Sequence, residues 1–107
     1  MASNSYRFTG RAEADLDEIL GYISTTLGNL SAAKSLFYEL FSKIELICDF
    51  PESYEIIHNE YVKRADVRKA LVGNYVVYYI VQKEERLITI LRIVYASRNL
   101  EEIIRLL

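Results

Sequence analysis

The side chains best suited to chemistry lie in the second half of the sequence, where cationic and aromatic residues are interleaved. The basic residues are Lys63, Arg64, Arg68, Lys69, Arg92 and Arg98, and the aromatic ones are Tyr61, Tyr75, Tyr78, Tyr79 and Tyr95. Lysine and arginine bind phosphates, and tyrosine rings stack on bases exposed from single strands. The pattern therefore predicts a surface that meets a polyanion. Tyrosines are also ordinary strand residues, so we expect at least half of them to be structural.

The distribution of charge along the chain favours the same interpretation. Residues 1–60 carry ten acidic and four basic side chains, and residues 61–107 carry five acidic and nine basic ones, within a formal net charge of −2. A basic second half favours a polyanion-facing surface there. Ordinary scatter of surface charge would give the same numbers, and the sequence leaves both alternatives open.

Other chemistries lack the residues that they need. The single histidine, His58, falls in an expected loop, so no zinc cluster and no well-founded catalytic triad can be built around it. No glycine-rich loop follows a strand, which argues against a P-loop or a dinucleotide site. We therefore expect no metal and no cofactor. Cys48 falls in an apolar helical pattern and is expected to be a buried thiol in a reducing, cytoplasmic setting. Asp15 and Glu18 are expected on a solvated helix face.

Length and hydropathy predict one domain over residues 1–107. A chain of 107 residues, 51% of them hydrophobic, is of a size to bury a modest core. No apolar run approaches the roughly 20 residues of a membrane span, and residues 1–5 have no secretory signal pattern.

The first half predicts a short strand followed by two amphipathic helices. Residues 6–8 alternate like a strand, and Thr9 is placed to cap the next helix. Apolar residues then recur at helical spacing on both sides of Gly28-Asn29, as Leu16, Ile19, Leu20, Ile23 and Leu27 and as Ala33, Leu36, Phe37, Leu40, Phe41, Ile44 and Ile47. The second helix should begin near Ser31 and end before Pro51. We expect an antiparallel helical hairpin.

The second half predicts strands at residues 67–72, 75–81 and 87–95, with a further short strand near Ile56-Ile57. One face of the first strand should carry Val67, Lys69 and Leu71, and the other Arg68, Ala70 and Val72. Tyr75, Val77 and Tyr79 should share one face of the next strand and Val76, Tyr78 and Ile80 the other, so we expect one set of tyrosines to be structural and the other exposed. With a last short helix, the order is β-α-α-β-β-β-α. The expected fold class is α+β, a helical hairpin packed on a curved antiparallel meander sheet.

Four segments carry a family resemblance. They are residues 12–23, Phe50-Pro51, 67–81 and 90–99, in this order along nearly the whole chain. Together they resemble the RelE/ParE superfamily, the toxins of bacterial type II toxin–antitoxin systems. The resemblance implies a growth-inhibiting toxin that is neutralised by a cognate antitoxin protein. Its target would be DNA gyrase, as for ParE-like members, or ribosome-bound mRNA, as for RelE-like members.

The resemblance also assigns expected roles to single residues. Arg98 falls where RelE-like toxins place a catalytic arginine, and Lys69 falls near a basic strand position that contacts RNA. The expected target-binding residues are Arg68, Arg92, Tyr95 and Asn99. In RelE-like cleavage the ribose 2′-OH attacks the adjacent phosphate without a metal, and basic side chains stabilise the developing charge.

Two departures from the RelE-like pattern argue against nuclease activity, and the long helical hairpin and the missing strand arginine resemble the ParE-like branch. Val76 stands where many ribonuclease members carry an arginine, and Ser97 stands where a basic residue is common. The acidic overall charge is also unlike the strongly basic ribosome-cleaving members. Arg92 and Arg98 could instead form salt bridges with acidic helix residues. The second hypothesis is a degenerate, non-toxic member that acts only as a protein-binding module.

The apolar C-terminal tail is a candidate surface for the antitoxin. Leu100, Ile103 and Ile104 recur at helical spacing and could dock a partly acidic, amphipathic segment that folds on binding. The alternative is a helix that packs on its own domain.

Overall fold

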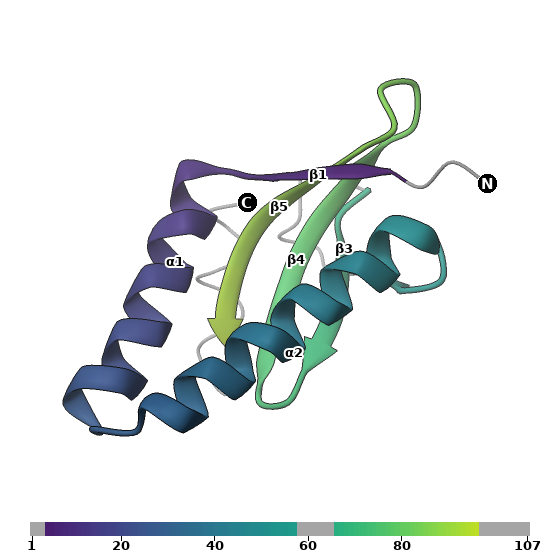
Figure 1. The fold of residues 1–107 in the computed structure, drawn as a ribbon. Coiled ribbons are helices and arrows are strands. Elements are labelled where there is room, and N and C mark those ends of the chain that lie inside the picture. The colour runs from purple at the N-terminus through teal and green to yellow at the C-terminus, as the bar shows by residue number, and fades with distance from the viewer. Residues whose placement is uncertain (1–3, 58–65, 97–107) are drawn as a thin grey trace.

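The computed structural model describes residues 4–57 and 66–96. In chain order the elements are β1 (Ser5–Phe8), α1 (Gly10–Gly21), the π-helical turn η1 (Tyr22–Thr26), α2 (Leu30–Asp49), β2 (Glu55–Ile56), β3 (Arg68–Val72), β4 (Tyr75–Gln82) and β5 (Leu87–Tyr95). Figure 1 shows α1 and α2 splayed into a V, with α2 crossing in front of the strands and α1 standing beside β5. The expected α+β fold with a helical hairpin on a sheet is confirmed. Within the described ranges, neither helix is long and apolar enough to cross a membrane.

The sheet is mixed, with the strand order β1-β5-β4-β3-β2. β3, β4 and β5 form the expected antiparallel meander. β1 instead lies parallel to β5, with Ser5 opposite Leu87 and Phe8 opposite Ile90. The alternation of residues 6–8 identifies a strand but not its neighbour, because that neighbour comes from the far end of the described chain.

Both helices begin at side-chain caps. Thr9 accepts a hydrogen bond from the Ala12 amide at 3.1 Å, as expected from the sequence, and Asn29 accepts one from the Ala32 amide at 3.0 Å. Gly28 precedes the second cap with φ of 62°, a conformation that glycine adopts without steric strain. α2 ends at Asp49, before Pro51, again as expected.

The strands place apolar side chains on both faces of the sheet. The layer between the helices and the sheet contains Leu40, Ile44 and Ile47 from α2. From the strands it contains Ala70, Val72, Val77, Tyr79, Ile88, Ile90 and Ile93. The layer on the far face contains Val67, Val76, Tyr78, Ile80 and Val94. The alternation expected for β3 and β4 is confirmed. The expectation that one set of tyrosines is exposed is wrong for this pair, because Tyr78 and Tyr79 lie on opposite faces and are only 1% and 0% exposed.

β5 extends beyond the end of β1. From Ile90 onward, main-chain groups on this edge of β5 form hydrogen bonds with Thr9 and with Asp15 of α1. The Thr9 amide donates to the Ile90 carbonyl at 3.0 Å, and the Thr9 hydroxyl donates to the Leu91 carbonyl at 3.1 Å. Further along, Asp15 Oδ2 accepts from the Ile93 amide at 3.0 Å. Buried main-chain groups are costly when unpaired, so these two side chains fix α1 against β5.

We expect Thr9→Val to lower the free energy of unfolding by about 1–2 kcal/mol, because it removes both the helix cap and the hydrogen bond to Leu91. Urea denaturation followed by circular dichroism measures the change. Thr25→Val is the matched control, since Thr25 is exposed in η1 and its replacement should cost no more than about 0.5 kcal/mol. Equal losses in the two variants would contradict this role for Thr9.

Candidate functional site

The structure describes four of the residues expected to act on a target, namely Arg68, Lys69, Arg92 and Tyr95. Arg98 and Asn99 lie outside the described residues, and so do the antitoxin-binding candidates Leu100, Ile103 and Ile104 and the expected last helix. His58, Tyr61, Lys63 and Arg64 also lie outside them. The four described residues do not form one cluster.

Arg68 and Lys69 are neighbours on β3 and therefore point to opposite faces of the sheet. Arg68 Nη1 donates to the main-chain carbonyls of Glu52 at 3.2 Å and Tyr54 at 2.6 Å. This arginine thus braces the segment that follows α2. Lys69 Nζ lies 3.9 Å from the Glu55 carboxylate, a long and partly exposed contact that adds little to stability.

Arg92 is committed to an internal ion pair with Asp15. Its Nε donates to Oδ2 at 2.7 Å and its Nη2 donates to Oδ1 at 3.0 Å. Arg92 and Asp15 are only 3% and 7% exposed. The expectation that Arg92 binds the target is therefore corrected, and the alternative, a salt bridge to an acidic helix residue, holds for it. The expectation that Asp15 is solvated is also wrong, because this side of α1 lies on β5.

Tyr95 lies at the end of β5 and is 49% exposed. Its ring meets that of Tyr75 edge to face, with centroids 5.5 Å apart. The two rings border a hollow of about 500 Å³ between β4, β5, α1 and η1. We call this hollow the tyrosine groove. It is lined by Asp15, Glu18, Ile19, Tyr22, Leu27, Tyr75, Ile93, Val94 and Tyr95.

Sequence reasoning missed Tyr22 and Glu18 as members of this groove. Tyr22 follows Glu18 by four positions and Ile19 by three, and this helical spacing was the available sign that the three side chains lie near one another. Their convergence with Tyr75 and Tyr95 depends on the contact between α1 and β5, which no local pattern reports.

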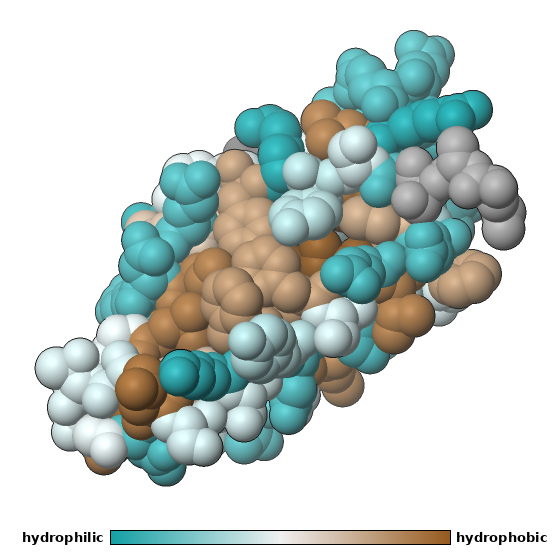
Figure 2. Space-filling view, viewed as in Figure 1, coloured by the Kyte–Doolittle hydropathy of each residue, from teal (hydrophilic) through white to brown (hydrophobic). Residues whose placement is uncertain are grey.

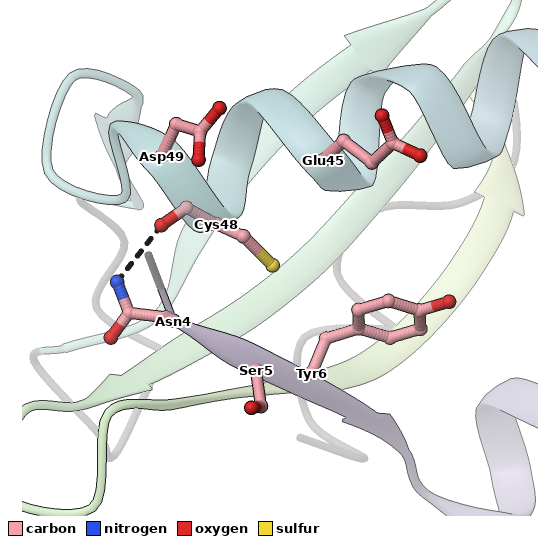
Figure 3. A pocket seen from close by; sticks show the side chains of 6 residues that line it. All are labelled: Asn4, Ser5, Tyr6, Glu45, Cys48 and Asp49. Atoms are coloured by element: carbon pink, nitrogen blue, oxygen red, sulfur yellow. Dashed lines mark hydrogen bonds between the residues drawn. The ribbon is translucent and has the colours of Figure 1, made fainter. Parts of the chain in front are cut away.

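A second hollow, of about 460 Å³, lies between β1 and the end of α2. In Figure 3 the Cys48 side chain points from α2 toward β1, and Asn4 Nδ2 donates to the Cys48 carbonyl at 2.9 Å. Burial raises the pKa of the Cys48 thiol, and the negative charges of Asp49 and Glu45 raise it further. The thiol is buried, as expected, and protonated at neutral pH. Across residues 4–57 and 66–96, no three side chains form a metal-binding group.

We therefore expect Cys48 to react with iodoacetamide more slowly than free cysteine at neutral pH, with a rate that climbs as pH rises toward its elevated pKa. Asp49→Asn should move this pH profile downward, because it removes a negative charge that disfavours the thiolate. Asp17→Asn, on the other helix, serves as the control. Mass spectrometry of the alkylated protein gives the rates, and a neutral-pH rate equal to that of free cysteine would contradict the assignment.

The helical face carries an exposed apolar strip. Figure 2 shows hydrophobic side chains gathered along the middle of this face between hydrophilic borders. Its aromatic members are Tyr6, Phe8, Phe37 and Phe41, with the Phe37 and Phe41 centroids 4.6 Å apart and those of Phe8 and Phe41 5.9 Å apart. We call these four residues the aromatic strip. Tyr6 and Phe37 are exposed, and Phe8 and Phe41 are half-buried against the core. Contiguous apolar patches at the surface can mark sites that contact other proteins.

Solved structures of low sequence identity share this fold. A structure of the chromosomal ParDE toxin–antitoxin system from P. aeruginosa aligns with a TM-score of 0.67 at 18% identity, covering 89% of this chain and 98% of that one. The RelBE2 complex from Mycobacterium tuberculosis gives 0.62 at 19% identity, covering 88% and 99%. The archaeal RelE-RelB complex from Pyrococcus horikoshii gives 0.60 at 16% identity, covering 92% and 100%.

Sequence comparison gives the family. No curated protein matches the chain significantly. The family model described as the ParE toxin of the type II toxin–antitoxin system parDE matches residues 6–100. This match spans most of the sequence and contains all of the strands and helices described above except Ser5, the first residue of β1. The chain therefore belongs to the ParE toxin family of type II toxin–antitoxin systems.

Proposed function

We propose that this protein is a growth-inhibiting toxin that acts by binding DNA gyrase and not by cleaving mRNA. The observation that carries the proposal is the commitment of Arg92 to Asp15. Cleavage by attack of a ribose 2′-OH needs free cations around the scissile phosphate. In the described part of the chain, Arg92 is held by a carboxylate, Arg68 by main-chain carbonyls, and Lys69 points to the face opposite Arg68.

Two further residues support a binding role over a nuclease role. Val76, at the position where many ribonuclease relatives carry an arginine, is buried in the far-face layer. The Tyr78 hydroxyl is buried and has no hydrogen-bond partner among the residues that the structure describes. Burial raises the pKa of the Tyr78 phenol, so this side chain remains neutral and does not serve as a base near neutral pH.

Neutralisation by a cognate antitoxin is part of the proposal. The aromatic strip supports it, because an apolar surface that is partly open to solvent fits a protein partner. The three similar solved structures are themselves toxin–antitoxin systems or complexes by name. Docking of the antitoxin at Leu100, Ile103 and Ile104 is also part of the proposal, and it rests on the sequence alone.

The test pairs two assays of the purified protein. The first follows DNA supercoiling by gyrase, and the second follows mRNA cleavage on programmed ribosomes. We expect inhibition of supercoiling at near-stoichiometric protein, relief when the cognate antitoxin is added first, and no cleavage. Cleavage that disappears in Arg98→Ala would overturn the proposal in favour of the RelE-like activity. Absence of both effects would overturn it in favour of a non-toxic binding module.

A further inference from the structure

We propose that the tyrosine groove binds an arginine side chain presented by a partner polypeptide. The inference does not depend on gyrase being the target of the protein. It rests on three converging phenol rings, an apolar floor and one carboxylate that has no ion-pair partner among residues 4–57 and 66–96.

The three rings belong to different elements but meet at one place. Tyr75 and Tyr95 are register partners across β4 and β5, and Tyr22 lines the same hollow from η1. The pKa of Tyr75 is raised by burial and also by its proximity to Tyr95 and Tyr22, in agreement with their convergence. Tyrosine faces attract a cation that lies within about 6 Å of the ring centre, and arginine is the commoner partner.

The π-helical turn η1 helps to build the groove. The Leu27 amide donates to the Tyr22 carbonyl at 3.0 Å, a bond between residues five apart. In an α-helix such residues point to different sides, whereas the wider π turn brings them over one side. Tyr22 and Leu27 therefore both line the groove, although both are more than half exposed to solvent. Single π turns occur frequently at functional sites.

The charges around the groove select a cation. Asp15 is neutralised by Arg92. Glu18 is exposed and forms no ion pair with any side chain in residues 4–57 or 66–96. A carboxylate beside phenol rings repels phosphate and attracts a guanidinium group, which it can bind in a bidentate manner.

The shape and polarity of the groove fit the rest of an arginine side chain. Ile19, Leu27, Ile93 and Val94 supply apolar walls for its aliphatic stem. The volume of about 500 Å³ lies within the range of sites that hold small ligand groups. The groove therefore fits the whole of an arginine side chain on a partner polypeptide.

The test uses the peptide acetyl-Leu-Arg-Leu-amide and its citrulline counterpart, which has nearly the same shape but no charge. Titration of ¹³C-tyrosine-labelled protein is followed by NMR. We expect saturable shifts of Tyr22, Tyr75 and Tyr95, and affinity for the arginine peptide about tenfold above that for the citrulline peptide. Equal binding of the two peptides, or no saturable shift at millimolar concentrations, would overturn the proposal.

Two pairs of variants locate the interaction. Glu18→Gln and Tyr95→Leu should each weaken binding of the arginine peptide at least about fivefold. Glu13→Gln, an exposed acid on the same helix, and Tyr38→Leu, an exposed tyrosine on α2, should leave it unchanged. All four positions are at the surface, so the variants should fold. A similar loss in Glu13→Gln and Glu18→Gln would show general charge attraction and contradict the groove.

Discussion

Asp15→Ala is expected to lower the free energy of unfolding by about 3–5 kcal/mol, because it leaves the Arg92 guanidinium buried, charged and unpaired. The same change removes the acceptor for the Ile93 amide on the open edge of β5. For a domain of this size the loss is a large fraction of the total stability. Urea denaturation of the two proteins measures it directly.

Three variants separate the causes of this loss. Asp17→Ala removes an exposed carboxylate from the same helix and should change stability by no more than about 0.5 kcal/mol. Asp15→Asn keeps an oxygen that can accept from the Ile93 amide but removes the negative charge. Its loss of unfolding free energy should lie between the losses of Asp17→Ala and Asp15→Ala. Replacing both partners, as Asp15→Leu with Arg92→Met, should restore most of the stability of the wild type. A loss below about 1 kcal/mol in Asp15→Ala would contradict a buried pair that anchors α1 to β5.

Val76→Arg is expected to lower the free energy of unfolding by about 3–5 kcal/mol. It should confer no mRNA cleavage, although it introduces the residue type that many ribonuclease relatives carry at this position. Val76 is only 6% exposed and packs with Val67, Tyr78, Ile80 and Val94. The new charge would therefore be buried among apolar side chains, which is costly.

Leu71→Arg is the matched control. Leu71 is the register partner of Val76 on the adjacent strand and is 62% exposed. The same substitution there should change the unfolding free energy by no more than about 0.5 kcal/mol. If Val76→Arg unfolded at the urea concentration of the wild type, position 76 would be open to a cation, and the argument against nuclease activity would lose one of its supports.

The features that could be predicted from the sequence are those with a local cause. The Thr9 cap, the break at Gly28 and the stop before Pro51 each follow from the chemistry of one or two neighbouring residues. The two faces of β3 and β4 follow from the period of the pleat. The helical hairpin follows from two apolar stripes and a short link.

The features that escaped prediction depend on contacts between distant segments. Asp15 has the sequence context of a solvated acid in the first turns of a helix. It is buried because β1 ends at Phe8 and leaves the Ile93 amide of β5 without a strand partner, and Asp15 accepts from that amide. Arg92 looked like a phosphate ligand because its partner is 77 positions away. Tyr22 entered no expected site, since its neighbours in space come from β4 and β5.

The parallel pairing of β1 with β5 also determines when the protein can fold during its synthesis on the ribosome. Synthesis delivers β1 and α1 first, but their hydrogen-bonding partners are the residues from Leu87 to Ile93. Contacts between such distant parts of a chain slow folding, and here they must await almost the whole described sequence. A nascent chain without β5 lacks one wall of the tyrosine groove and the partner of Asp15. The fold on which the proposed toxicity depends is therefore incomplete until translation has passed β5.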